Sequence, residues 1–127
     1  MGSILEFKSN GNVASGYLAE PSTLKGGIIV LQEWWGLNAH IKDLCDRFAE
    51  KGYLSLAPDM YDGEIAAEPD EAGKLMMALD IENSANKLHG AVEYLHQKTG
   101  KAVGTVGFCM GGALSLFAAC NEGSKIG

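Results

Sequence analysis

The segment Gly107-Phe108-Cys109-Met110-Gly111 sets a nucleophilic side chain between two glycines. A short apolar run with β propensity precedes it and a run with helical composition follows it, which is the context of a sharp strand-to-helix turn. Such a turn directs the thiol of Cys109 beyond the end of the strand, and the positive end of the following helix favours a thiolate. The pattern predicts that Cys109 is a catalytic nucleophile. The alternative is an unreactive cysteine in a glycine-rich turn.

Two backbone amides and a carboxylate are expected beside this thiol. The N–H of Met110 opens the helix and is placed to donate to a developing oxyanion. Another apolar run ends in Gln32-Glu33-Trp34-Trp35-Gly36. The Glu33 carboxylate would hydrogen-bond the thiol or oppose its ionisation, unless it is simply a solvent-facing loop residue. The two tryptophans predict a pocket wall, and the amide near Trp34 is the expected second oxyanion donor.

Short strand-like runs alternate with runs that carry apolar residues at helical spacing. The first two, 4–8 and 13–18, flank Asn10-Gly11 and predict a hairpin. The elements expected after the hairpin are strands over 28–31, 53–58 and 102–108, and helices over 41–49, 71–79, 81–95 and 111–119. This alternation predicts one α/β domain over residues 1–127, with a parallel sheet flanked by helices.

Ligands of open parallel sheets bind beyond the carboxyl ends of the strands. Three segments are expected at that edge: residues 32–38, the long acidic loop 59–70, and Cys109 with its neighbours. The predicted reactive groups therefore converge on one crevice, although they come from distant parts of the sequence.

Composition excludes several classes of protein. The 127 residues are 46% apolar, as in a globular domain, and carry a net charge of −6 with no stripe of Lys or Arg, so no nucleic-acid partner is expected. No apolar run approaches the roughly 20 residues of a membrane span, and the N-terminus lacks a signal peptide pattern. The three cysteines are not spaced as metal ligands. We expect no metal, no cofactor, no membrane and a reducing, cytoplasmic setting.

Three segments resemble, in order and spacing, the signatures of the dienelactone hydrolase family of α/β-hydrolases. They are Gln32-Glu33-Trp34-Trp35-Gly36-Leu37-Asn38, Ala57-Pro58-Asp59-Met60-Tyr61 and Gly107-Phe108-Cys109-Met110-Gly111-Gly112-Ala113. The resemblance extends over essentially the whole chain. It implies an α/β-hydrolase fold and hydrolysis of a small-molecule lactone or related ester by a Cys-His-Asp triad.

The resemblance also implies roles for single residues. Cys109 occupies the position of the nucleophile. Glu33 occupies that of a glutamate that contacts the resting thiol and is displaced by substrate. Trp34 and Met110 match the two backbone oxyanion donors. The expected reaction is attack on the carbonyl, ring opening to an acyl thioester, and release.

One segment departs from the family pattern. Trp35 and Tyr61 are the expected substrate contacts, but after the tyrosine the dienelactone enzymes carry an arginine and aromatic residues that hold the substrate carboxylate. The corresponding stretch 68–77 contains neither. This difference predicts an ester or lactone other than a dianionic dienelactone.

The family's triad aspartate and histidine lie downstream of the nucleophile, whereas this sequence stops at Gly127 and residues 124–127 have the pattern of a lead-in to a further strand. We therefore expect the N-terminal portion of a hydrolase, truncated after the helix that follows Cys109 and inactive unless the triad is completed. Such a chain would associate with a copy of itself or with a complementing C-terminal half. The alternative is a non-catalytic binding or assembly module that retains the pocket. The histidines are expected at the surface: His40, His89 and His96.

Overall fold

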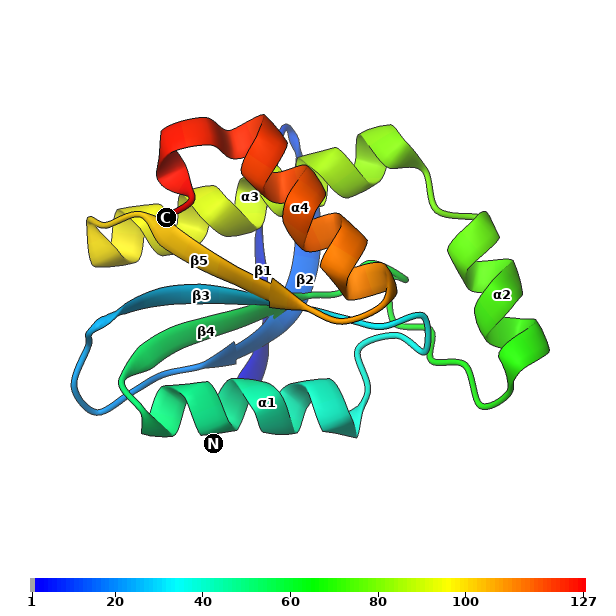
Figure 1. The fold of residues 1–127 in the computed structure, drawn as a ribbon, viewed down its shortest axis with the longest axis horizontal. Helices are drawn as coiled ribbons and strands as arrows, with labels where there is room; N and C mark the ends of the chain where they lie inside the picture. The colour runs from blue at the N-terminus through cyan, green and yellow to red at the C-terminus, as the bar shows by residue number, and fades with distance from the viewer. Residues whose placement is uncertain (1) are drawn as a thin grey trace.

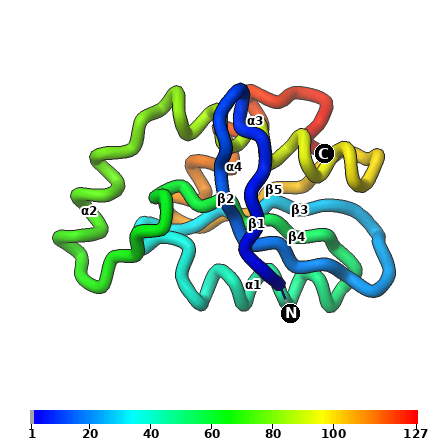
Figure 2. The backbone as a smooth tube through the Cα atoms, turned by 180° about the vertical axis from the view of Figure 1, so that it is seen from behind, coloured from blue at the N-terminus to red at the C-terminus, as the bar shows by residue number. Residues whose placement is uncertain are grey.

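The chain begins with the predicted hairpin. Asn10 and Gly11 both have positive φ, 50° and 92°, which is the backbone of the tight turn that Asn-Gly favours. This turn joins β1 (Ser3–Ser9) to β2 (Asn12–Ala19) in antiparallel pairing. The computed structural model describes residues 2–127. Seen from behind, the hairpin lies across one edge of the sheet (Figure 2).

Three parallel strands form the core of the sheet, as predicted. They are β3 (Gly26–Leu31), β4 (Tyr53–Pro58) and β5 (Val103–Gly107). The strand order is β1-β2-β4-β3-β5, with β2 antiparallel to β4 and with β3 parallel to both of its neighbours. The apolar strands β3 and β4 therefore lie at the centre, where both faces of the sheet are covered.

The helices cover both faces of the sheet (Figure 1). Helix α1 (Ala39–Glu50) packs on one face, and α3 (Ile81–Thr99) and α4 (Met110–Glu122) pack on the other. Helix α2 (Pro69–Met77) stands away from the sheet, beyond the carboxyl ends of the strands, and a short 3₁₀ turn spans Gly123–Lys125. Among residues 2–127, no helix is both long and apolar enough to cross a membrane.

The predicted helices are confirmed, with shifts of up to four residues at their ends. The side chain of Asn38 caps α1 by accepting a 3.2 Å hydrogen bond from the Ile41 amide. Gly100 ends α3 in the left-handed conformation, with φ of 69°. Helix α2 begins two residues earlier than predicted, because Pro69 fits the first helical turn, where no backbone donor is needed.

The apolar core consists of one cluster on each face. The cluster on the α1 face includes Ile41 and Cys45, both almost fully buried. The larger cluster lies between the sheet and helices α3 and α4, and includes Leu31, Leu56 and Leu88. The two clusters fix the sheet between rigid helices, so the carboxyl ends of β3 and β5 are held in place.

Strand β5 lies at the edge of the sheet, and its outer side begins to be paired. Ile126 forms an isolated parallel bridge with Val103, and the Gly127 amide donates a 3.0 Å hydrogen bond to the Val103 carbonyl. The strand lead-in predicted at residues 124–127 is thus seen only at residues 126 and 127, because Gly123–Lys125 forms the 3₁₀ turn.

Candidate functional site

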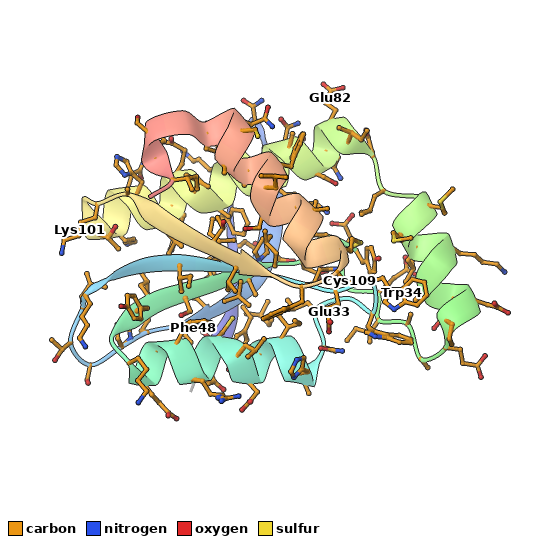
Figure 3. All side chains as sticks on the ribbon, viewed as in Figure 1. Glu33, Trp34, Phe48, Glu82, Lys101 and Cys109 are labelled. Carbon is orange, nitrogen blue, oxygen red and sulfur yellow. The ribbon has the colours of Figure 1, made fainter. Side chains whose placement is uncertain are left out.

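The predicted reactive segments meet at one edge of the sheet. Strands β3 and β5 are parallel neighbours, with Leu31 paired to Gly107, so the residues that follow each strand emerge side by side. Figure 3 shows Glu33, Trp34 and Cys109 together at this edge, beside the start of α4. The structure therefore places the two segments as the sequence predicts.

The elbow (residues 107–111) has a strained backbone at its central residue. Cys109 has φ of 57° and ψ of −120°, a conformation that L residues rarely adopt and that persists only where the surrounding structure imposes it. Here the constraint is the joint between β5 and α4. The Cys109 side chain is exposed to solvent at this turn. Strain that presents an accessible thiol is typical of a functional position.

The two glycines of the elbow are required by the close approach of backbones. A β-carbon on Gly111 would lie 2.5 Å from the Leu31 carbonyl oxygen and 2.7 Å from that of Gln32. A β-carbon on Gly107 would clash with the backbone of Gly111. Helix α4 can therefore begin directly against the end of β3 only if both positions lack a side chain.

Two backbone donors at this edge have no acceptor. Met110 is the first residue of α4, where amides lack an intrahelical partner. Within residues 2–127, neither its N–H nor that of Trp34 donates a hydrogen bond. In the same part of the chain, no hydrogen bond joins the Glu33 carboxylate to the Cys109 thiol. The hydrogen bond predicted for Glu33 is therefore not formed in this conformation, and its predicted effect on the ionisation of the thiol stays a prediction.

A buried amide side chain fixes the loop that carries Glu33. Gln32 is completely buried, and its Oε1 accepts a 2.9 Å hydrogen bond from the Met60 amide. The Trp35 carbonyl accepts a second bond, 2.8 Å, from the Ala66 amide. These bonds join the loop after β3 to the loop after β4. Sequence reasoning did not assign this role to Gln32, although a polar residue directly after an apolar strand was a usable signal.

Two charged residues hold the loop after β4. Asp59 is almost buried, and its carboxylate accepts hydrogen bonds from the Tyr61 amide at 3.0 Å and from the Gly63 amide at 2.8 Å. The ammonium of Lys87 on α3 lies 2.7 Å from Asp62 Oδ1. The Lys87 side chain is 5% exposed, so it is one of the few buried charges of the protein and it ties the loop to the helix layer. Neither role was predicted from the sequence.

Tyr61 contacts the elbow at Met110. Its side chain is buried, and its hydroxyl donates a 3.4 Å hydrogen bond to Met110 Sδ. Burial raises the pKa of Tyr61, so the hydroxyl remains a donor over the physiological range. The structure thus places Tyr61 against the first residue of α4, and its predicted contact with substrate stays a prediction.

A cavity opens beside this edge, between Trp34 and α2. It measures about 500 Å³. Its lining residues are Trp34, Pro69, Asp70, Gly73, Lys74, Met76 and Met77. The ring of Trp34 stands edge-on to that of Trp35, with centroids 5.5 Å apart, so the two rings support each other. Trp34 therefore lines the cavity, as predicted, whereas Trp35 does not line it and only contacts the Trp34 ring, and the predicted contact of Trp35 with substrate stays a prediction.

The three histidines do not converge on the elbow. His89 Nδ1 lies 3.0 Å from Glu122 Oε1, and His96 Nδ1 lies 2.9 Å from the Lys101 carbonyl oxygen. His40 is exposed on the first turn of α1. Among residues 2–127, no group of His, Cys, Asp and Glu has the geometry of a metal site.

The three cysteines differ in accessibility. Burial raises the pKa of Cys45 to about 12, and the charge of Asp46 adds to this effect. This thiol is protonated and inert at neutral pH, which agrees with the predicted packing role. Cys120, at the opposite end of α4, is exposed like Cys109 but lies on a regular helix. Both thiols are exposed, but only Cys109 lies on a strained turn. Comparing their reactivity therefore distinguishes the effect of backbone conformation from that of accessibility.

The sequence is similar to known hydrolases. The sequence model of the dienelactone hydrolase family matches residues 14–126. Protein usf of Aquifex pyrophilus is 43% identical over 127 residues, covering 92% of this chain and 54% of that protein. Carboxymethylenebutenolidase of Pseudomonas putida is 34% identical over 104 residues, covering 72% of this chain and 44% of that protein. The chain spans about half the length of the curated relatives it matches.

Solved structures show the same fold. A dienelactone hydrolase-like promiscuous phosphotriesterase from metagenomic libraries superposes with a TM-score of 0.81 at 23% identity, over 98% of this chain and 55% of that chain. Dienelactone hydrolase from Anabaena variabilis superposes with a TM-score of 0.73 at 20% identity, over 99% of this chain and 60% of that chain. The expected α/β-hydrolase fold is thereby confirmed. Together with the family match over residues 14–126, this shows that the chain belongs to the dienelactone hydrolase family.

Proposed function

We propose that this chain carries the nucleophile half of an enzyme that hydrolyses a small-molecule ester or lactone, with the thiol of Cys109 as the attacking group. The observation that supports this most is the backbone of Cys109, strained at φ of 57° on a turn that exposes its side chain. Relatives named carboxymethylenebutenolidase and dienelactone hydrolase provide the reaction class.

The proposed reaction proceeds through a thioester. The Cys109 thiolate attacks the carbonyl carbon, and the C=O electron pair moves to the oxygen. The amides of Met110 and Trp34, which have no other acceptor within residues 2–127, are the proposed donors to this oxyanion. Collapse breaks the C–O bond and leaves an acyl thioester and an alkoxide, which takes up a proton. Water then hydrolyses the thioester and restores the thiol.

Glu33 is proposed to control the resting state of the nucleophile. The Glu33 carboxylate lies at the same sheet edge as the Cys109 thiol, and binding of the substrate is proposed to displace it. The Trp35 ring is proposed to support the substrate wall behind Trp34, and Tyr61 to position the Met110 amide through its hydrogen bond to the Met110 sulfur.

The decisive experiment is acyl transfer from an activated ester to the protein. After a short exposure to 4-nitrophenyl acetate, mass spectrometry of peptides is expected to find the acetyl group on Cys109 well before Cys120. Both thiols are exposed, so a faster reaction at Cys109 must come from its setting. Cys109→Ala is expected to abolish the fast phase of nitrophenolate release, whereas the matched variant Cys120→Ala retains it. Equal acylation of the two cysteines would rule out the proposed nucleophile.

The second candidate is a non-catalytic binding module that keeps the pocket. It is favoured by the positions of His89 and His96, which are engaged with Glu122 and with the Lys101 carbonyl, away from the elbow. The two functions separate in the same experiment, because a binding module would hold a small ester or its acid reversibly without acylation of Cys109.

We further propose that the triad is completed by a segment that pairs with the outer edge of β5. This edge already accepts a parallel neighbour at Ile126, and the matched relatives are about twice as long as the region they share with this chain. A complementing segment in this position would lie next to Cys109. Because the proposed nucleophile requires a free thiol, we also propose a reducing, cytoplasmic setting.

A further inference from the structure

We propose that the cavity between Trp34 and α2 binds the acyl group of the ester, and that it selects uncharged apolar acyl groups against acyl groups that carry a carboxylate. This inference rests on the proposed function, because it places a substrate beside Cys109. It concerns the cavity of about 500 Å³ described above.

The position of the cavity makes it an acyl subsite. Trp34 contributes both the cavity wall, through its ring, and a proposed oxyanion donor, through its amide. Figure 3 shows Trp34 at the same sheet edge as Cys109 and on the side of α2. An acyl carbonyl held at that amide would direct the rest of the acyl group along the ring and into the cavity.

The lining of the cavity is suited to apolar groups. Trp34 faces Met76 and Met77 across the hollow, and Pro69 and Gly73 add carbon surface without charge. Met77 is 81% exposed, a high value for a large apolar residue. Methionine side chains adapt to ligands of irregular shape and interact well with aromatic rings. An alkyl or aryl chain would bury this exposed surface.

The charges around the cavity oppose a substrate carboxylate. The charges of the two ionisable lining residues, Asp70 and Lys74, cancel each other. The segment 59–71, which contributes Pro69 and Asp70 to the lining, carries six carboxylates and no basic residue, and only Asp62 among them forms an ion pair, with Lys87. Glu33 adds a further negative charge at the same edge as Trp34. The formal charge of the segments that border the cavity is therefore net negative, which disfavours an incoming anion.

Two matched esters test the selectivity for charge. The probes are the 4-nitrophenyl esters of glutaric acid and of its monomethyl ester, which differ in one carboxylate. Attack by Cys109 forms a C–S bond, breaks the C–O bond, releases nitrophenolate and gives the thiol proton to water. At low ionic strength the neutral ester is expected to acylate Cys109 about tenfold faster or more, and added salt is expected to narrow the ratio.

Charge variants locate the effect in the cavity. Asp70→Lys is expected to lower the ratio of neutral to anionic rate several-fold. The matched control Glu50→Lys, at the far end of α1, makes the same change of charge and is expected to leave the ratio unchanged. Equal rates for the two esters, or an equal effect of both variants, would overturn the proposed selectivity.

Chain length tests the cavity itself. The test compares the rates at which 4-nitrophenyl hexanoate and 4-nitrophenyl acetate acylate Cys109. The ratio of the hexanoate rate to the acetate rate is expected to fall several-fold in Trp34→Ala. It is expected to stay constant in Phe48→Ala, which removes a ring from the α1 face of the sheet. An unchanged ratio in Trp34→Ala would overturn the acyl subsite.

The two proposals fail in different ways. Absence of any preferential acylation of Cys109 by all four esters would reject the proposed nucleophile. The cavity can then be tested without acylation, by adding hexanamide or the monoamide of glutaric acid and measuring tryptophan fluorescence. Quenching by hexanamide alone would support a preference for uncharged acyl groups, and equal quenching by both amides would reject it.

Discussion

Gly111 and Cys109 together determine how closely helix α4 approaches the sheet. The glycine lets the helix begin against the carbonyl oxygens of Leu31 and Gln32, and the cysteine takes the strained positive-φ conformation that turns the chain. The strained cysteine and one of the close backbone contacts of the elbow are thus two residues apart. Strain at the cysteine is maintained by contacts that its neighbour makes.

Gly111→Ala is expected to destabilise the protein by about 2–3 kcal/mol, because the added methyl group would lie 2.5 Å from a backbone oxygen that cannot move freely. Gly73→Ala is the matched control. Its β-carbon would meet nothing within 4 Å, in the interior of α2, so a gain of about 0.5–1 kcal/mol is expected from helix propensity. Urea denaturation measures both, and equal effects would contradict the proposed contact.

Cys45 is expected to make stability fall at alkaline pH. Its pKa is raised to about 12 by burial, above the value of 9.0 that applies when it is exposed, so the folded state favours the neutral thiol. The stabilisation is complete below pH 9 and is lost as the pH rises toward 12, with a slope of up to about 1.4 kcal/mol per pH unit. Unfolding free energies should fall less steeply in Cys45→Ala, and parallel curves would contradict the assignment.

The loops after β3 and β4 behave as one element at the sheet edge. They are joined by the bond between Gln32 and Met60 and by the bond between Ala66 and Trp35, and Asp59 shapes the second loop by two bonds of its own. Helix α2 follows this pair of loops and closes the cavity against Trp34. The rigidity of the cavity wall at Trp34 therefore depends on the hydrogen bonds that join the two loops.

Gln32→Leu is expected to cost about 1–3 kcal/mol, since it leaves the Met60 amide buried without an acceptor. It is also expected to slow acylation of Cys109, because Glu33 and Trp34 follow directly in the chain. Gln97→Leu changes an exposed glutamine on α3 and should alter stability by less than about 0.5 kcal/mol. Thermal denaturation and nitrophenolate release provide the two measurements. Normal stability of Gln32→Leu would show that the bond is dispensable.

The two edges of the sheet are formed by different strands, β1 of the hairpin at one edge and the parallel strand β5 at the other. The hairpin β1–β2 occupies the first edge. At the other edge, β5 is paired with β3 along its inner side, and within residues 2–127 its outer side is bridged only at Ile126. Two large apolar side chains near this edge are exposed, Phe108 by 57% and Leu116 by 68%. An unpaired edge next to exposed apolar surface promotes association.

The 127-residue chain is therefore expected to self-associate in sedimentation at high concentration. Leu116→Glu should shift it toward monomer by placing a charge on α4. Val13→Glu is the matched control, because Val13 is similarly exposed, by 66%, but lies on the hairpin side. A folded monomer at all concentrations would contradict this expectation, and a complementing segment that restores activity would compete with self-association.

The sequence by itself determined the order of the elements and the fold class. Apolar runs of strand length, helical periodicity, Asn10-Gly11 and the glycines around Cys109 are local signals, and each was confirmed in the structure to within a few residues. Local signals suffice here because turn chemistry and side-chain periodicity act over a few residues.

Only the tertiary structure decided which distant groups meet. The burial of Gln32 and Lys87, the contact of Tyr61 with Met110 and the cavity between Trp34 and α2 all join segments that are 25 or more residues apart. Their partners depend on strand order and helix placement, which no local pattern specifies. The sequence alone therefore predicts a strained cysteine after a strand, and the fold decides what lies around it.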